Sequence, residues 1–145
     1  MKILVDTNVV LDTLLKRSSF YQDSFTIFQL VDQEIISGYI TASVITDIFY
    51  IASKELKSAE AVYVGIENLT SLFSIALVSE TTITNALALR WKDFEDAVQF
   101  ITAKENNVDY IITRNVADFK NTDIPCMSPT DFIAYLKENE SAEKG

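Results

Sequence analysis

Short apolar segments alternate with longer amphipathic segments along almost the whole chain, and this alternation constrains the fold more than any other feature. The short segments have strand length and are rich in β-branched residues, as at 2–5. The longer ones carry apolar residues at helical spacing, as at Val10, Leu11, Leu14 and Leu15. Strands that alternate with helices form parallel sheets covered on both faces. The sequence therefore predicts an α/β fold.

The predicted elements follow one another without a linker or an internal repeat. We expect strands at 2–5, 39–41, 73–78, 109–113 and 124–127, and helices at 9–15, 20–36, 43–53, 58–72, 81–90, 93–106 and 129–136. Ser43, Ser58 and Asp93 are expected N-caps, and Pro129 suits a first helical turn. These elements predict one domain over residues 1–137, followed by a polar C-terminal tail at 138–145.

Composition excludes several kinds of chemistry. The chain has no His, which rules out Ser-His-Asp catalysis and His-ligated metals, and its single cysteine, Cys126, cannot form an internal disulfide. Chemistry must come from carboxylates, Lys, Tyr, hydroxyls or a metal that they bind. The apolar runs are far shorter than the roughly 20 residues that span a bilayer, and no basic-then-apolar leader precedes Asp6. We therefore expect a cytoplasmic protein without a membrane segment.

Acidic and amide side chains stand just beyond predicted strands or near the beginnings of helices. Asp6 follows the strand at 2–5, and Asn115 and Asp118 follow the strand at 109–113. Asp47 and Asp96 lie in the first turns of two predicted helices. In an open parallel sheet, ligands bind beyond the carboxyl ends of the strands. We therefore expect these side chains to converge in one pocket.

Each position also has a purely structural interpretation that the sequence leaves open. Asp6 suits a helix N-cap, Asp93 and Asp96 suit a cap and its N3 partner, and the loop pair suits an Asx-turn. Asp47 fits such an interpretation less well. It shares a helical stripe with Ile48 and is predicted to point toward apolar surroundings, where an unpaired charge is costly.

Converging carboxylates need a cation, because at low dielectric they repel one another by several kcal/mol. Ligand sets that contain only oxygen favour Mg²⁺ or Mn²⁺ over zinc or copper. Such an ion keeps water molecules, one of which can act as a nucleophile. The sequence therefore predicts Mg²⁺ or Mn²⁺ as cofactor.

Four ordered motifs resemble one known family. They are Asp6-Thr7-Asn8-Val9-Val10-Leu11-Asp12, Thr46-Asp47-Ile48, Glu95-Asp96-Ala97-Val98-Gln99, and Ile112-Thr113-Arg114-Asn115 followed by Asp118-Phe119. In this order the chain resembles the PIN domain, and more particularly the bacterial VapC-like and stand-alone PIN ribonucleases. The resemblance implies a three-layer α/β/α sandwich around a parallel sheet of four to five strands, commonly dimeric. It also implies RNA hydrolysis by metal-activated water.

The resemblance implies roles position by position. It gives Asp6, Asp47, Asp96 and Asp118 as catalytic acids and metal ligands, Asn115 and Asp93 as further ligands, and Asn8 and Thr113 as supporting hydrogen bonders. Two positions depart from the common pattern: the second acid, Asp47, is usually Glu, and the fourth place, here Asn115, often holds Asp. Asp12 and Glu95 are expected to face solvent.

RNA binding conflicts with the bulk charge of −9 unless bound cations invert the charge at the site. The predicted RNA contacts are Arg114, Lys120, Arg90 and Lys92, with Lys16, Arg17 and Lys104 as further basic candidates. Trp91 either stacks on a base or fills the core. The excess apolar residues Phe20, Tyr21, Phe25 and Phe28 predict a surface for a second copy or a partner such as an antitoxin.

Two other classes of function compete with a ribonuclease. One is a catalytically inactive RNA-binding or interaction module on the same fold, with Asp47 and Asn115 marking lost activity. The other is an aspartate-based phosphotransfer domain. A receiver domain would show an acidic pair at its first strand, where this chain has only Asp6, and a phosphatase would show a second Asp where this chain has Asn8.

Overall fold

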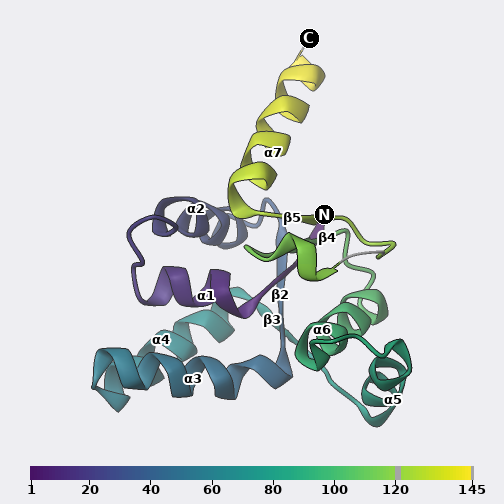
Figure 1. The fold of residues 1–145 in the computed structure, drawn as a ribbon. Coiled ribbons are helices and arrows are strands. Elements are labelled where there is room, and N and C mark those ends of the chain that lie inside the picture. Colours follow the sequence, from purple (N-terminus) through teal and green to yellow (C-terminus); the bar gives the residue numbers. More distant parts are fainter. Residues whose placement is uncertain (120–121, 145) are drawn as a thin grey trace.

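A sheet of five parallel strands forms the centre of the computed structural model, which describes residues 1–119 and 122–144 (Figure 1). Its strands are β1 (Lys2–Val5), β2 (Ser37–Thr41), β3 (Ser74–Ala76), β4 (Tyr110–Ile112) and β5 (Cys126–Met127). They lie in the order β3-β2-β1-β4-β5, and every neighbouring pair is parallel. The predicted parallel sheet is thus confirmed.

Helices cover both faces of the sheet. They are α1 (Thr7–Leu14), α2 (Tyr21–Asp32), α3 (Ala42–Leu56), α4 (Ala59–Leu72), α5 (Glu80–Leu89), α6 (Phe94–Glu105) and α7 (Pro129–Lys144), with a short 3-10 helix, η1 (Val116–Phe119). One core lies between the sheet and helices α1 to α4, and a second lies between the sheet and α5 and α6. This is the expected three-layer α/β/α sandwich.

Alternation along the strands divides the core between the two faces. Ile3 and Val5 of β1 are fully buried against the layer of α1 to α4, whereas Leu4 is fully buried against α6. Gly38 in β2 allows Phe73 to pack closely, because a Cβ atom there would lie 2.5 Å from ring carbons of Phe73. The central strands are therefore buried on both faces, as their continuous apolar runs indicate.

Local signals placed most helix beginnings correctly. Ser58 and Asp93 cap α4 and α6 through their side chains. Ser43 is not a cap, because α3 already begins at Ala42, directly after β2. Helix α7 passes the predicted end at 136 and runs to Lys144, so most of the predicted polar tail is helical and extends away from the sheet (Figure 1). None of the described helices is long and apolar enough to cross a membrane.

Candidate functional site

The strand order reverses at β1, which has β2 on one side and β4 on the other. Leu4 pairs with Tyr39 of β2 and with Ile111 of β4. Two residues further along each strand, Asp6, Thr41 and Thr113 therefore reach the carboxyl edge of the sheet on the face that α6 covers. A parallel sheet offers its ligand-binding crevice at such a point.

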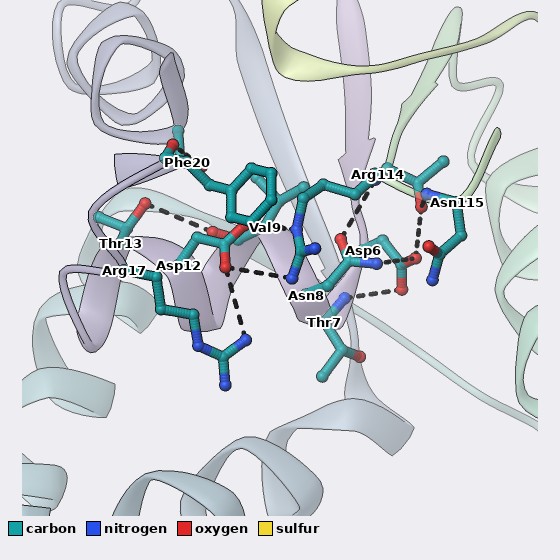
Figure 2. A network of polar contacts seen from close by, with 12 residues as sticks. Asp6, Thr7, Asn8, Val9, Asp12, Thr13, Arg17, Phe20, Arg114 and Asn115 are labelled. Atoms are coloured by element: carbon teal, nitrogen blue, oxygen red, sulfur yellow. Dashed lines mark hydrogen bonds and ion pairs between the residues drawn. The ribbon is translucent and has the colours of Figure 1, made fainter. Parts of the chain in front are cut away.

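Asp6 stands at this edge and is held by four donors. Its Oδ1 accepts from the Thr7 backbone N–H at 2.7 Å and from Gln99 Nε2 at 2.8 Å. Its Oδ2 accepts from Thr113 Oγ1 at 2.7 Å and from Asn8 Nδ2 at 3.3 Å (Figure 2). Asp6 is therefore both the N-cap residue of α1 and a buried, rigidly oriented carboxylate. Asn8 and Thr113, which the resemblance gives as supporting hydrogen bonders, both donate to it.

Asp96 approaches Asp6 from the first turn of α6. The Asp93 side chain caps this helix and accepts the Asp96 backbone N–H at 3.1 Å. Asp96 is buried, and burial raises the pKa of its carboxyl group from 3.8 to about 7, with further contributions from the charges of Asp6, Asp93, Asp118 and Glu95. Folding has thus placed a carboxyl group where its own ionisation is unfavourable.

A single cavity of about 320 Å³ contains most of the predicted acids. Its lining includes Asp6, Asp93, Asp96, Asn115 and Asp118 from the predicted set, together with Thr7, Asn8, Glu95 and Arg17. Glu95 and Asp118 are exposed, whereas Asp6 and Asp96 are buried. The cavity therefore has two buried acids, Asp6 and Asp96, at its floor and exposed acidic side chains at its rim.

Asp47 differs from its prediction. It is exposed, because the buried face of α3 consists of Val44, Ile48 and Ala52, and Asp47 lies beside that face rather than on it. It lines an adjoining hollow together with Thr7 and Glu95, both of which also line the acidic cavity. Asp47 therefore reaches the edge of the site and not its floor.

Glu95 was predicted to face solvent, and it is exposed, but it also takes part in the site. Its Oε1 accepts from Thr7 Oγ1 at 3.2 Å, and it lines both hollows. Its pKa is raised by burial and then by the charge of Asp47. Gln99, which sequence reasoning overlooked, is fully buried and bonds to Asp6. The signal for Gln99 was present, because a polar residue three positions after Asp96 falls on the inward face of α6.

Asp12 was also predicted to face solvent, but it is completely buried. Arg114 donates to it from Nε at 2.7 Å and from Nη2 at 3.3 Å, and Arg17 donates from Nη1 at 3.4 Å (Figure 2). The Arg114 guanidinium also lies 4.1 Å from the centroid of the Phe20 ring. Two arginines thus compensate this buried charge, and Arg17 at the same time lines the acidic cavity.

The sequence model of the PIN domain matches residues 2–117. The chain belongs to the PIN-domain family. Members of this family are generally nucleases. None of the curated proteins compared with the chain matches it significantly.

Solved structures agree with this PIN fold. VapBC2 of Rickettsia felis, bound to a DNA fragment from its promoter, has 19% identity and a TM-score of 0.66, covering 88% of this chain and 98% of that chain. A toxin-antitoxin complex from Klebsiella pneumoniae has 22% identity and a TM-score of 0.65, covering 88% and 97%. FitAcB of Neisseria gonorrhoeae has 19% identity and a TM-score of 0.65, covering 88% and 98%. At this identity the likeness concerns the fold.

Two further predicted RNA contacts of this PIN domain, Arg90 and Lys92, do not line the acidic cavity. Arg90 and Lys92 are exposed in the connection between α5 and α6, and Lys120 lies outside the described residues. Trp91 stacks on Phe100 with ring centroids 5.3 Å apart, which identifies it as a core residue. Arg17 is therefore the basic side chain that the described part of the chain places on the lining of the cavity.

The donor set of the cavity suits a hard divalent cation. It offers carboxylate and amide oxygens, with no thiol and no imidazole. Within residues 1–119 and 122–144, no three acidic or thiol side chains lie close enough together to hold a metal ion without rearrangement. Exposed acids at the rim would complete such a set by reorienting around a bound ion, and a nearby cation would favour the ionisation of Asp96, which is unfavourable without one.

Proposed function

We propose that this PIN domain is a Mg²⁺- or Mn²⁺-dependent endoribonuclease that hydrolyses RNA phosphodiester bonds. The observation that carries the proposal is the convergence of Asp6, Asp96, Asp93 and Asp118 in one cavity at the point where the strand order reverses. Structural stability does not explain this convergence, because like charges in a buried site oppose folding. A site built to bind a cation and a phosphate explains it.

The buried and the exposed residues of the cavity have different roles in this proposal. Asp6 and Asp96 form the fixed floor that would hold the ion, and Asp118, Asn115 and Asp47 complete its shell from the rim or through water. When bound, the ion supplies a nucleophilic water and neutralises charge on the phosphoryl oxygens. Four donors keep Asp6 oriented during the reaction.

Arg17 is suited to bind the phosphate. It lines the cavity, and its contacts with Asp12 and Glu55 are both 3.4 Å long, so its guanidinium retains donors for another acceptor. Arg114, our preferred RNA contact from sequence, is bound more tightly to Asp12, at 2.7 Å. We therefore assign phosphate binding first to Arg17, and more peripheral RNA contacts to Arg114, Arg90, Lys92 and Lys120.

RNA cleavage with defined metals tests the proposal. Purified protein is incubated with single-stranded RNA and with transfer RNA in Mg²⁺, Mn²⁺ or EDTA, beside Asp6→Asn and Asp96→Asn. Asp32→Asn is the matched control, because Asp32 is exposed at the end of α2. We expect the wild type and the Asp32→Asn control to cleave RNA, and we expect EDTA to abolish this cleavage. Equal cleavage by the Asp96→Asn variant would refute the proposal, and binding without cleavage would favour the inactive module.

We also propose that the protein acts in the cytoplasm as the toxin of a toxin-antitoxin pair and forms a homodimer. Its structural neighbours include toxin-antitoxin complexes, and it exposes apolar side chains such as Phe25, Tyr50 and Tyr63. Induced expression should then arrest growth, and Asp96→Asn should abolish the arrest. Sedimentation of the purified protein decides whether it is a dimer, and growth unaffected by the wild-type protein would contradict the toxin assignment.

A further inference from the structure

A second cavity, of about 310 Å³, adjoins the acidic cavity and has no role in the reaction described above. It lies between the segment before α2 and the beginning of α7. Asn115 lines both cavities, so the two cavities lie next to each other. A volume of this size lies within the range of small-molecule sites.

One wall of the second cavity is a fixed, flat, cationic surface. Phe20 is 43% exposed, and the Arg114 guanidinium lies 4.1 Å from the centroid of its ring (Figure 2). Asp12 holds that guanidinium in place with a 2.7 Å hydrogen bond from Nε. Aromatic rings and guanidinium planes of this kind are the surfaces on which unpaired bases stack.

Other residues of the lining carry hydrogen-bonding groups and a negative charge. Thr130 Oγ1 and Asp23 Oδ2 lie 2.5 Å apart and connect the beginning of α7 to α2, with Ser128 beside them. A carboxylate repels a phosphate but accepts hydrogen bonds from base N–H groups. The cavity therefore suits the base of a nucleotide and not its phosphate, whereas the neighbouring acidic cavity with its cation suits the phosphate.

We propose that the second cavity binds one unpaired nucleobase of the RNA strand, adjacent to the phosphodiester bond that is cleaved. The proposal rests on the ribonuclease function. It makes the enzyme selective for single-stranded segments, because a paired base cannot leave its stack without losing its partner.

Substrates with a single abasic nucleotide test this assignment. In a series of short single-stranded RNAs, the abasic position is moved one nucleotide at a time past the cleaved bond. We expect kcat/KM to fall about 5- to 150-fold at one position next to that bond. The Phe20→Ala variant should cleave all substrates equally, whereas Phe20→Tyr should retain the positional effect. Phe25→Ala is the matched control, because Phe25 is similarly exposed on α2 but lies outside this cavity.

Failure of the base site and failure of the nuclease are distinguishable. Cleavage that is indifferent to every abasic position, or a positional effect that persists in Phe20→Ala, overturns the base site and leaves the nuclease intact. If no RNA is cleaved, the wild-type protein in Mg²⁺ is titrated into RNA that contains a central 2-aminopurine. The base site is supported if the protein quenches the 2-aminopurine fluorescence and the Phe20→Ala change removes this quenching. The absence of quenching refutes the base site.

Discussion

Replacing Asp96 with Asn should stabilise the metal-free protein. The carboxyl group of Asp96 is buried, and within residues 1–119 and 122–144 it has no hydrogen-bond or ion-pair partner. Its surroundings raise its pKa to about 7, so the folded state opposes its ionisation. Asn has nearly the same shape and cannot ionise. The variant therefore removes an unfavourable charge while it leaves the packing of α6 unchanged.

The sign and size follow from the difference in pKa between the two states. The unfolded chain ionises near the ordinary value of 3.8 and the folded chain near 7, so the folded state holds more protons between these values. Stability is therefore lost as pH rises from about 4 to about 7. A pKa that is raised by about three units corresponds to a loss of about 4 kcal/mol in the free energy of unfolding once the carboxyl group is ionised. Solvent screening of the exposed neighbours and loss of the favourable helix-dipole interaction reduce the expected gain to about 1–2 kcal/mol.

Urea denaturation in EDTA measures this gain. At pH 8 the free energy of unfolding of Asp96→Asn should exceed that of the wild type by about 1–2 kcal/mol, and at pH 5 the difference should fall below about 1 kcal/mol. Asp32→Asn, which changes an exposed acid, should stay within about 0.5 kcal/mol of the wild type at both values. A variant less stable than the wild type at pH 8 would show that Asp96 is not under electrostatic strain.

Three further measurements test the electrostatics of the site. Calorimetry should show Mn²⁺ binding to the wild type and at least roughly tenfold weaker binding to Asp96→Asn, and equal affinities would contradict the ligand assignment. Asp12→Ala should lower the free energy of unfolding in urea by about 2–4 kcal/mol, since it leaves two arginines without their buried partner, and a loss below about 0.5 kcal/mol would contradict this. Thr113→Val should cost about 1–3 kcal/mol while Thr113→Ser remains near wild type, and similar losses in both would mean that the hydroxyl bond to Asp6 is unimportant.

The sequence predicted the fold well because its signals were local. Period and length separate strands such as Lys2–Val5 from helices, and alternation with helices fixes a parallel sheet. The boundaries were less certain where two signals competed. Helix α3 begins at Ala42, before the good cap Ser43, because the end of β2 leads directly into it. Helix α7 continues past residue 136 through polar residues, exposed at 137–142, which carry no apolar period.

The floor of the site was predictable, whereas its rim was not. Asp6 and Asp96 occupy positions that the strand ends and the first helical turn determine. The position of Asp47 depends on a rotation of about 100° per residue around α3, and a one-residue error in the estimated buried face reverses its exposure. Glu95 is exposed as expected, but the sequence did not indicate that it also lines the cavity. Asp12 was misjudged because its partners Arg17 and Arg114 are distant in sequence or separated by a turn. A salt bridge of this kind has no periodic signature.

Two buried acids, Asp12 of α1 and Asp96 of α6, show how the protein distributes its negative charge. Asp12 lies between two arginines, so its charge is compensated within the chain and it has no need of a cation. Asp96 is also buried but lies near other acids, and among the described residues it has no basic partner. The same helix-rich scaffold could have compensated both, since Arg17 lines the cavity that contains Asp96. Among the described residues, basic side chains neutralise only Asp12. Because the pKa of Asp96 is raised to about 7, this carboxyl group still holds a proton in part of the molecules at neutral pH, and the proposed metal ion would compete with that proton.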